Sequence, residues 1–422
     1  MIFIGALRGR ISNLSEKIKD KANKIARDAM VILKNCLSSH SEKDLVVLDD
    51  MFPHPLSAFR IAEYNCYLKH FGNVDVHSTA ATFTLIGEAR GFSEICSRYE
   101  REFPQFAGHV IRFNRRRVLR AKLVYTMFLN NAFFFIDYIE KENIPFVFTL
   151  YPGGGFQLNQ EDSDRKLRRV LSSPLLRKVI VTQTISYRYL VDNQFCLSDK
   201  VEHIYGVVLP TDRLTMHRFP KSYYKKHKDT FDLCFVAHKY TRDGADKGYD
   251  VFLDVASLLS KIYPDIVFHV VGPFDASVLD VSELQGRIRF YGSLETGFFP
   301  EFYAGMDMIL SPNIPFVLAP GAFDGFPTGC CVEAGLCGVA VMCTDPLGQN
   351  SKFKDREEIL LVPHDSIEIF KVIDNYYNRY EDLCCLAERG REAFTRVFDM
   401  DAQMDPRRRV LTECMNTGAL NR

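Results

Sequence analysis

The chain of 422 residues lacks an excess of charge, because 53 lysine and arginine residues balance 53 acidic residues. A formal net charge of zero provides no bulk positive field for nucleic acid, so we expect no nucleic-acid partner. The 12 cysteines have no regular spacing that would indicate a disulfide framework, and no paired C-x-x-C or H-x-x-x-H motif that would indicate a zinc site. We therefore predict no metal centre and a place in the reducing cytosol.

A long hydrophobic run is also missing near the N-terminus. Arg8 and Arg10 interrupt the opening apolar residues, which predicts neither a spanning helix nor a signal peptide. Residues 5–35 instead form an amphipathic helical pattern with a basic polar face. Such a helix can lie on an anionic membrane surface, pair with another helix or pack on its own domain. We expect a cytoplasmic protein, either free or peripheral on the inner face of the membrane.

The length and composition favour two globular domains. The chain exceeds the size at which one hydrophobic core keeps growing, and its content of 47% hydrophobic and 25% charged residues is ordinary for a globular protein. Short apolar strand patterns alternate with helical patterns in both halves, which indicates parallel βαβ units. In the first half we expect strands at 43–50, 73–79 and 144–156 and a strongly apolar helix at 123–143.

The second half repeats this alternation after a polar, basic segment at 217–230. We predict strands at 231–238, 266–273, 287–294 and 307–313, a helix at 250–263, and two helices within 365–398. The fold class is therefore α/β, with two Rossmann-like domains that face each other across a cleft. The predicted parts are an N-terminal helical extension (1–43), a first domain (44–216), a linker (217–230), a second domain (231–398), and a C-terminal helix (399–422) that crosses back to the first domain.

The stretch DGFPTGCCVEAGLCGVAVMCTD, from Asp324 to Asp345, places a tight turn before a buried helix. If Thr328 caps a helix that starts near Gly329, the free amide groups of the first helical turn and the helix dipole form a seat for phosphate. Gly325 and Gly329 let the backbone approach a ligand, and Pro327 fixes the turn. An ordinary capped core helix explains the same stretch when it is taken alone.

Further polar residues fit a nucleotide ligand. Glu333, one turn into this helix, is placed to accept hydrogen bonds from ribose hydroxyl groups. The stretch DGADKGYDVFL places Lys247 at the start of another helix on the same side of the sheet, where it can neutralise a diphosphate. Lys239 and Arg242 in the same loop are candidates for a second cation. Each of these cations, taken singly, could equally be a solvated surface residue.

These motifs in order, KGYDVFL, VVG, RIRFYGSL, FYAGMDMILSPN and the stretch from Asp324, carry a family resemblance. Residues 231–396 resemble the nucleotide-sugar-binding domain of retaining glycosyltransferases with the GT-B fold, the group that includes glycogen-synthase-like and polysaccharide glycosyltransferases. The resemblance implies that Lys247 grips the diphosphate, that Glu333 holds the ribose, and that the backbone from Phe326 to Gly329 cradles sugar and phosphate. It also adds three candidate binding residues, Gly272, Tyr291 and Gly292.

The sequence departs from the family pattern at the first acid of the motif. Asp324 stands where the family has glutamate, and eight residues rather than seven separate it from Glu333. The resemblance makes Asp324 a candidate catalytic residue together with Lys247 and Glu333. It also implies transfer with retention on the front face of the sugar, with no metal, because cations and helix amide groups can stabilise the leaving diphosphate.

The first domain supplies the candidates for acceptor binding. His54 can act as a base or be an ordinary loop histidine. The triple glycine at 153–155 can admit a substrate or form a flexible turn. The acids of VVLDD (46–50) are either solvated or near the acceptor, and the arginines at 115–120 either meet a charged acceptor or lie on a solvated helix face.

Our first hypothesis is a retaining glycosyltransferase that transfers a hexose from a nucleotide-diphosphate sugar to a surface polysaccharide, such as lipopolysaccharide, or to another glycan, free or lipid-linked. No cofactor is expected beyond this donor substrate. Two alternatives stay open: a nucleotide-sugar epimerase of the same fold, and a non-catalytic nucleotide- or sugar-binding scaffold. The expected partners are the donor, the glycan acceptor, and a membrane surface or partner helix for residues 5–35.

Overall fold

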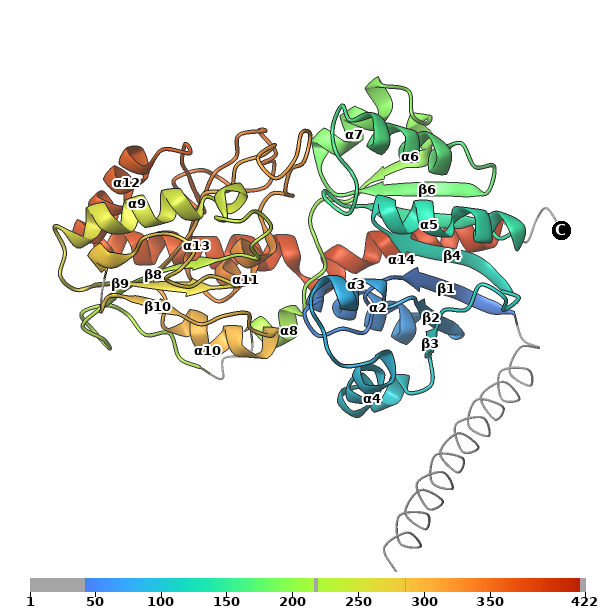
Figure 1. Ribbon diagram of the computed structural model, residues 1–422, viewed down its shortest axis with the longest axis horizontal. Coiled ribbons are helices and arrows are strands. Elements are labelled where there is room, and N and C mark those ends of the chain that lie inside the picture. Colours follow the sequence, from blue (N-terminus) through green and yellow to red (C-terminus); the bar gives the residue numbers. More distant parts are fainter. Residues whose placement is uncertain (1–41, 216–218, 285, 418–422) are drawn as a thin grey trace, which may run out of the picture.

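Two parallel β-sheets, one in each half of the chain, organise the protein (Figure 1). The computed structural model describes residues 42–215, 219–284 and 286–417. The amphipathic helix predicted at 5–35 lies outside these residues. The predicted α/β class with two Rossmann-like domains is confirmed. The domain boundaries at 43, 216, 230 and 398 stay predictions.

The first sheet has seven strands in the order β3-β2-β1-β4-β5-β6-β7, all parallel. Its strands are β1 (Lys43–Asp49), β2 (Val74–Ser78), β3 (Val110–Arg112), β4 (Ala121–Met127), β5 (Phe146–Leu150), β6 (Leu176–Val181) and β7 (Val201–His203). Its helices are α2 (Ala58–His70), α3 (Ala81–Leu85), α4 (Phe92–Glu102), α5 (Leu129–Lys141), α6 (Glu161–Leu171), α7 (Thr184–Asp192) and α8 (Thr211–Thr215). The chain reverses its direction across the sheet between β1 and β4, so these neighbouring strands form a topological switch point.

The second sheet has six parallel strands in the order β10-β9-β8-β11-β12-β13, with a switch point between β8 and β11. Its strands are β8 (Phe231–Val236), β9 (Ile266–Val271), β10 (Ile288–Phe290), β11 (Met308–Ser311), β12 (Ala340–Cys343) and β13 (Leu360–Leu361). Its helices are α9 (Tyr249–Ser260), α10 (Phe299–Ala304), α11 (Gly329–Leu336), α12 (Ser366–Asn378) and α13 (Tyr380–Phe398). Short 3₁₀ helices lie at Pro104–Phe106, Ser198–Lys200, Ala245–Lys247 (η3), Ser282–Leu284 and Thr296–Phe298.

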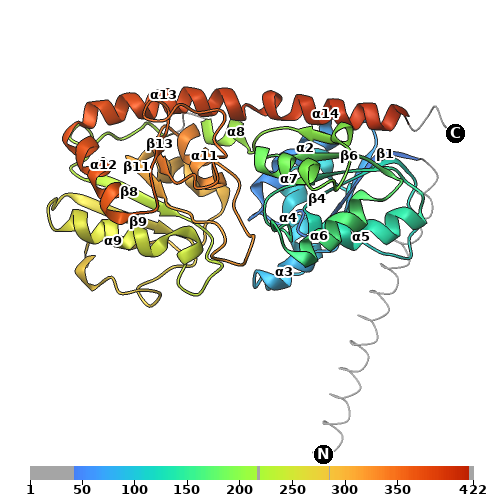
Figure 2. The ribbon, with the colours of Figure 1, turned by 90° about the horizontal axis from the view of Figure 1, so that it is seen from above.

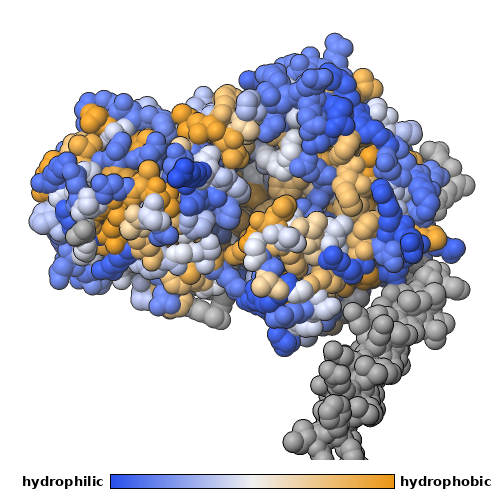
Figure 3. Space-filling view, viewed as in Figure 1, coloured by the Kyte–Doolittle hydropathy of each residue, from blue (hydrophilic) through white to orange (hydrophobic). Residues whose placement is uncertain are grey.

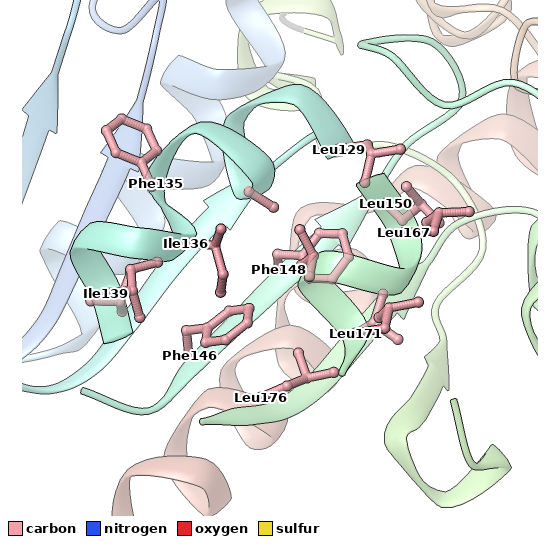
Figure 4. Close-up of a cluster of buried hydrophobic side chains, with 14 of the residues drawn as sticks. Leu129, Phe135, Ile136, Ile139, Phe146, Phe148, Leu150, Leu167, Leu171 and Leu176 are labelled. Atoms are coloured by element: carbon pink, nitrogen blue, oxygen red, sulfur yellow. The ribbon is translucent and has the colours of Figure 1, made fainter. Parts of the chain in front are cut away.

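Apolar side chains fill both faces of each sheet, because the helices of a βαβ chain cover the two faces in turn. Figure 4 shows one such layer, in which Ile136 and Ile139 of α5 lie beside Phe146 and Phe148 of β5. All four side chains are fully buried. The strands are therefore mostly hydrophobic, and the polar residues that line the cavities described below lie in loops and helix starts beyond the strand ends.

The C-terminal helix crosses from the second domain to the first, as predicted. Figure 2 shows α13 and α14 (Met400–Thr417) end to end along one side of both domains. Helix α14 contacts α2, β4 and β6 of the first domain. Its Arg407 is fully buried and donates hydrogen bonds to the backbone and the side chain of Gln403. This helix therefore holds the two domains together opposite the cleft.

One predicted element is wrong. The segment 123–143 is not a single helix, because residues up to Met127 form the central strand β4 and α5 starts at Leu129. Phe128 separates the two elements with a positive φ of 70°. A strand buried on both faces is a continuous apolar run, and such a run has no periodicity that would distinguish it from a buried helix. Within the described ranges, no helix is both long enough and apolar enough to span a bilayer.

Candidate functional site

Two cavities lie where the carboxyl ends of the two sheets meet, and each is at a topological switch point. The α11 cavity, of about 340 Å³, is lined by residues that follow β8, β9 and β11 and by the start of α11, including Ala237, His238, Lys247, Gly272, Asn313, Thr328 and Gly329. The β1 cavity, of about 430 Å³, is lined by residues that follow β1, β4 and β5, including Asp50, Arg60, Phe128, Asn130, Asn131 and Gly153. Open α/β sheets bind their ligands at this position.

The two cavities share the side chains of Tyr240, Lys247 and Asp324. These residues therefore form the boundary between a space built by the second domain and a space built mainly by the first. Figure 3 shows the hollow between the two domains on the surface, with hydrophobic residues on both sides of it.

Lys247 is positioned by the turn η3 and by Gly248. Gly248 has a φ of 69°, and a Cβ atom on it would lie 2.1 Å from the carbonyl oxygen of Pro312. Only glycine fits this close approach, which fixes the lysine at the start of α9. Burial, the largest single influence, would lower the pKa of Lys247, but Asp324 together with Tyr240 and Asp246 outweighs burial and raises the pKa above its ordinary value. Lys247 is therefore a cation at neutral pH.

Asp324 holds this lysine from the opposite loop. The Lys247 ammonium donates to both carboxylate oxygens, with N–O distances of 2.8 and 2.6 Å. The side-chain amide of Asn313 donates to the same carboxylate at 2.7 Å. The Asp324 side chain keeps 40% of its surface exposed. The predicted meeting of the 324 loop and the 239–247 loop is therefore a direct ion pair at the cavity wall.

The turn after Asp324 is wedged between the domains. Phe323 packs in the core of the first domain, and Phe326 packs in a core cluster of the second. The side-chain amide of Gln183 from the first domain donates to the carbonyl oxygen of Phe326 at 3.2 Å, and a Cβ atom on Gly325 would lie 3.1 Å from that amide nitrogen. Pro327 is buried behind this turn. These residues fix the position of the start of α11.

Helix α11 begins at Gly329, as predicted, but Thr328 does not cap it with its side chain. Thr328 occupies the N-cap position with an extended backbone, yet its hydroxyl group makes no bond to a helix amide. That hydroxyl group lies 3.3 Å from the hydroxyl oxygen of Ser311 and 3.2 Å from the sulfur of Cys330. The first amide groups of a helix have no intrahelical partner. The start of α11 therefore offers free N–H groups and the positive end of its dipole to the cavity.

Glu333 lies one turn beyond Cys330; Cys330 lines the α11 cavity, whereas Glu333 is not among the residues of its wall. Its carboxyl group is half-buried, and no hydrogen bond or ion pair to it is found among the described residues. Burial, with a smaller effect of Cys330, raises the pKa of Glu333 to about 8. A buried carboxyl group without a partner is costly, which makes it ready to receive hydrogen bonds from a ligand.

The predicted residues from β9 and β10 divide into two groups. Gly272 lines the α11 cavity, and a Cβ atom on it would lie 1.9 Å from the carbonyl oxygen of Ala237. Gly292 accepts a hydrogen bond from the Gly272 amide through its carbonyl oxygen at 2.9 Å. The Tyr291 hydroxyl group instead lies 2.8 Å from Nδ1 of His269, away from the cavity, and the residues that reach its wall from this loop are Ser293 and Leu294.

The predicted second cation is also not at the wall of either cavity. The Lys239 ammonium lies 5.9 Å from the ring centre of Phe274, and Arg242 is exposed to solvent. His238, which the sequence analysis did not single out, does line the α11 cavity. Desolvation and the nearby Lys247 ammonium lower the pKa of His238, so its imidazole is neutral at pH 7 and can donate one hydrogen bond. Its place as the second residue after β8, at a switch point, is the signal that could have identified it.

His54 is not placed to act directly on a substrate. It is 2% exposed, its Nε2 lies 2.8 Å from Glu88, and its ring packs edge-on against Phe83. Its Nδ1 accepts the backbone N–H of Leu56 at 3.3 Å, so the proton is on Nε2 and is donated to Glu88. His54 lines neither cavity and instead shapes the 51–57 loop, because both ring nitrogens are engaged within the first domain.

Asp50 is the acid that the structure brings to the β1 cavity. Arg60 and Asn131 both donate to its Oδ1 at 3.0 Å, and the hydroxyl group of Thr82 donates to its Oδ2 at 2.6 Å. Asp49, the preceding residue, is fully buried and accepts hydrogen bonds from Arg60 at 3.0 Å and from Tyr64 at 2.8 Å. The two acids of VVLDD are thus separated: Asp49 anchors Arg60 in the core, and Asp50 faces the cleft.

The triple glycine at 153–155 packs against the turn between β4 and α5. A Cβ atom on Gly155 would lie 2.0 Å from the side chain of Asn130. The backbone N–H of Asn130 donates to the carbonyl oxygen of Gly154 at 2.9 Å. Gly153 and Gly154 line the β1 cavity. The glycines therefore form a fixed part of the cavity wall.

Across the described parts of the chain, no group of three or more metal-binding side chains is found.

Comparison with known proteins agrees with this architecture. Residues 230–378 match the family described as Glycosyl transferases group 1. HepE from Anabaena, solved in complex with UDP and glucose, is similar with a TM-score of 0.64 and 14% identity, covering 88% of this chain and 100% of that chain. A glycosyltransferase from Rickettsia africae has a TM-score of 0.60 and 13% identity, with coverages of 89% and 99%. Sucrose-phosphate synthase from Thermosynechococcus elongatus has a TM-score of 0.58 and 16% identity, with coverages of 88% and 100%. Among curated proteins, no sequence matches this chain.

Two parallel-sheet domains that face each other across a cleft, with a cation and a helix N-terminus at the switch point of the second, have the architecture of the GT-B fold. The second domain, at residues 230–378, is the part of the chain that matches the Glycosyl transferases group 1 family.

Proposed function

We propose that the chain transfers a hexose from a uridine-diphosphate sugar to a glycan acceptor. One observation carries the donor assignment: the Lys247 ammonium and the free amide groups at the start of α11 line the same cavity of about 340 Å³. Both groups bind phosphate oxygens well. The choice of uridine is supported by HepE, whose structures contain UDP and UDP-glucose.

The α11 cavity has separate groups for the parts of the donor. The diphosphate lies against the start of α11 and Lys247, which exchanges part of its contact with Asp324 for the phosphate. His238 donates a neutral hydrogen bond to the same diphosphate. Glu333 accepts hydrogen bonds from the ribose hydroxyl groups, which gives its carboxyl group the partners that it lacks in the free protein. The hexose then lies at the boundary formed by Lys247, Asp324 and Tyr240.

The transfer step needs stabilisation of one developing charge. The bond between the anomeric carbon and the β-phosphate oxygen breaks, and its electron pair goes to the phosphate. Lys247 and the amide groups of α11 stabilise this charge, which is the usual main contribution of such fixed donors. The acceptor oxygen bonds to the anomeric carbon from the same face, and its proton passes to the phosphate oxygen. The products are UDP and a glycoside with retained configuration, and no separate base is required.

The acceptor enters from the first domain, through the β1 cavity. The proposed acceptors are surface polysaccharides, lipopolysaccharide among them, and other glycans, free or lipid-linked. Attachment to the inner face of the membrane through residues 5–35 belongs to this proposal, and it rests on the basic amphipathic pattern of that segment.

Calorimetry with nucleotides tests the donor site. UDP should bind more tightly than GDP, ADP, CMP or dTDP, and Lys247→Ala should weaken UDP binding by about 1.5 to 3 kcal/mol, the size of a charge-assisted hydrogen bond. Part of this loss comes from Asp324, which then lies unpaired beside the diphosphate. The double variant Lys247→Ala/Asp324→Asn should therefore bind UDP more tightly than Lys247→Ala alone.

Lys239→Ala is the matched control, because Lys239 lies in the same loop but not at the cavity wall. Its UDP affinity should equal that of the wild type. An unchanged affinity in Lys247→Ala would remove Lys247 from the site. Incubation with the UDP-sugar alone separates the alternatives: a new sugar epimer without acceptor indicates an epimerase, and UDP binding with no turnover of any sugar or acceptor indicates a scaffold.

A further inference from the structure

The loop between β11 and α11 exposes three large apolar side chains in a row. Phe316, Val317 and Leu318 are 46%, 44% and 48% exposed. The other exposed large apolar residues of the described chain are separated from one another in the sequence, and isolated exposed residues need no explanation. A run of three beside a substrate cleft indicates a surface that an apolar group covers.

This loop has a defined shape. The Phe316 amide donates to the carbonyl oxygen of Ala322 at 2.7 Å, which closes the loop on itself. The Leu158 amide of the first domain donates to the carbonyl oxygen of Gly321 at 2.9 Å. Gly321 has a φ of 74°, and a Cβ atom on it would lie 2.1 Å from the carbonyl oxygen of Leu158. The loop is therefore docked on the first domain at a position that only glycine permits.

The apolar loop and the acid of the first domain line the same space. Leu318, Ile314 and Ala322 form part of the wall of the β1 cavity, together with Asp50. The Asp50 side chain is 30% exposed. Its Oδ1 accepts two hydrogen bonds, whereas the described residues give its Oδ2 only one, from Thr82. A carboxylate oxygen can accept two, so Oδ2 keeps the capacity to accept a hydroxyl group from the cavity.

The charges of the β1 cavity argue against a second nucleotide. Asp50, Asp246 and Asp324 line it, and its cations, Arg60 and Lys247, already pair with these acids. A diphosphate would meet carboxylates there without a free cation. A neutral alcohol is not repelled by these carboxylates, because its hydroxyl group can donate a hydrogen bond to one of them. Lys247 and Asp324 also place this cavity next to the diphosphate site, where the acceptor oxygen must lie.

We propose that the β1 cavity binds the acceptor as an amphiphilic alcohol, whose sugar hydroxyl group donates to Asp50 and whose aliphatic chain covers Phe316, Val317 and Leu318. This inference rests on the proposed function, since it names the acceptor class for that reaction. The same loop carries Asp324 further along, so the chain-binding surface and the donor boundary are parts of one connection between β11 and α11.

The lack of tryptophan in the chain allows a direct test. A Val317→Trp variant places a single fluorophore on the loop. Octyl β-glucoside, used below its micelle concentration, should shift the emission of this tryptophan to the blue in a saturable manner. Methyl β-glucoside should bind at least about tenfold more weakly, because it lacks the chain that would be buried. Leu197→Trp is the control reporter, since Leu197 is 72% exposed and lines neither cavity.

Two second-site variants test the two ends of the site in the Val317→Trp background. Leu318→Ser should weaken octyl glucoside binding about fivefold or more through lost apolar contact. Asp50→Asn should weaken it about tenfold through loss of the charged acceptor. Thermal unfolding of each variant checks that it is folded, and Thr82→Val, which removes a neighbour of Asp50 without removing the carboxylate, should have a smaller effect than Asp50→Asn.

Each outcome decides the inference. No shift with octyl glucoside, an equal shift in Leu197→Trp, or equal affinity for the octyl and methyl glucosides overturns it. UDP calorimetry on the same variants separates this inference from the proposed function. A protein that binds UDP but not octyl glucoside refutes only the amphiphilic acceptor site. A protein that binds octyl glucoside but no nucleotide refutes the proposed function, and the assignment of the cavity to an acceptor falls with it.

Discussion

The α11 cavity and the β1 cavity share a wall but are built differently. The α11 cavity depends on backbone: close approach at Gly272, the free start of α11 at Gly329, and one cation, Lys247. The β1 cavity depends on side chains that come from distant parts of the chain and fix one another, as Arg60 and Asn131 fix Asp50. A site made of backbone groups can bind the same diphosphate in many proteins, whereas a site made of side chains can be specific to one acceptor.

The two cavities also differ in how their charges are supported. The β1 cavity has a charge network that continues into the core, where Asp49 is fully buried and Arg60 is 6% exposed. The cation of the α11 cavity has a partner, Asp324, whose side chain is 40% exposed. Loss of a buried charge partner is far more costly than loss of a partner that water can replace. The charges of the β1 cavity are therefore expected to be tied to folding, and those of the α11 cavity much less so.

Arg60→Met should have the largest effect on stability. It leaves the fully buried Asp49 carboxylate with Tyr64 and two backbone amide groups but no countercharge, and such a loss costs about 3 to 5 kcal/mol. Lys247→Met should cost clearly less. Urea unfolding measures both.

Arg165→Met is the control for removal of an arginine, because its ion pair with Asp162 is exposed and water can replace it at little loss of stability. Equal losses of stability in Arg60→Met and Lys247→Met would contradict the difference between the two cavities.

Glu333→Gln should have the next largest effect on stability, and the size of this effect should depend on pH. The pKa of Glu333 is about 8 in the folded protein and near 4.5 when the chain is unfolded. The group therefore contributes full stability below pH 4.5 and loses that contribution as the pH rises toward 8, because the unfolded chain releases its proton first. At pH 7, about 2.5 units above the unfolded pKa, the amide variant should be more stable than the wild type by up to about 3 kcal/mol. Parallel stability profiles of the two proteins from pH 5 to 8 would show that this carboxyl group has no raised pKa.

The same titration should be visible in nucleotide binding. Ribose hydroxyl groups that donate to Glu333 stabilise its carboxylate, so UDP binding at pH 7 should release part of a proton. Calorimetry in two buffers with different heats of ionisation measures this release, and Glu333→Gln should abolish it. If Glu333→Gln is more stable than the wild type but still releases a proton when it binds UDP, the ribose does not bind at Glu333.

Much of the second domain could be predicted from the sequence because its motifs are local. The start of α11 at Gly329 and the position of the 239–247 and 324 loops on the same side of the sheet both follow from strand, turn and helix order, whereas the ion pair that joins these loops was not predicted. That His238 rather than Arg242 lies at the cavity wall could not be predicted, since the direction of a side chain after a strand depends on the turn dihedral angles. The direction of the Tyr291 side chain could not be predicted for a similar reason, because alternate residues at a strand end face opposite sides.

The first domain was harder to predict because its site is not local. Asp50, Thr82 and Asn131 approach one another only because β1 and β4 are neighbours at the switch point. This contact could be predicted only if β4 was recognised as a strand. The sequence of 123–143 instead favoured one long helix in place of β4 and α5. His54 was an attractive base by residue type, but its partner Glu88 is 34 residues away and cannot be identified from sequence order.

The smallest expected effect is a difference in stability between alanine variants at two helix N-cap positions, Asp365 and Thr328. Asp365 caps α12 by accepting the amide groups of Ile367 and Glu368, both at 2.9 Å, so Asp365→Ala should cost about 1 kcal/mol of stability. Thr328 makes no such bond, so Thr328→Ala should cost less than about 0.5 kcal/mol in urea unfolding. Amide groups at a helix start that no capping side chain engages can donate hydrogen bonds to a phosphate. If Thr328→Ala costs as much as Asp365→Ala, the amide groups of α11 are already engaged, and the seat proposed for the diphosphate is not free.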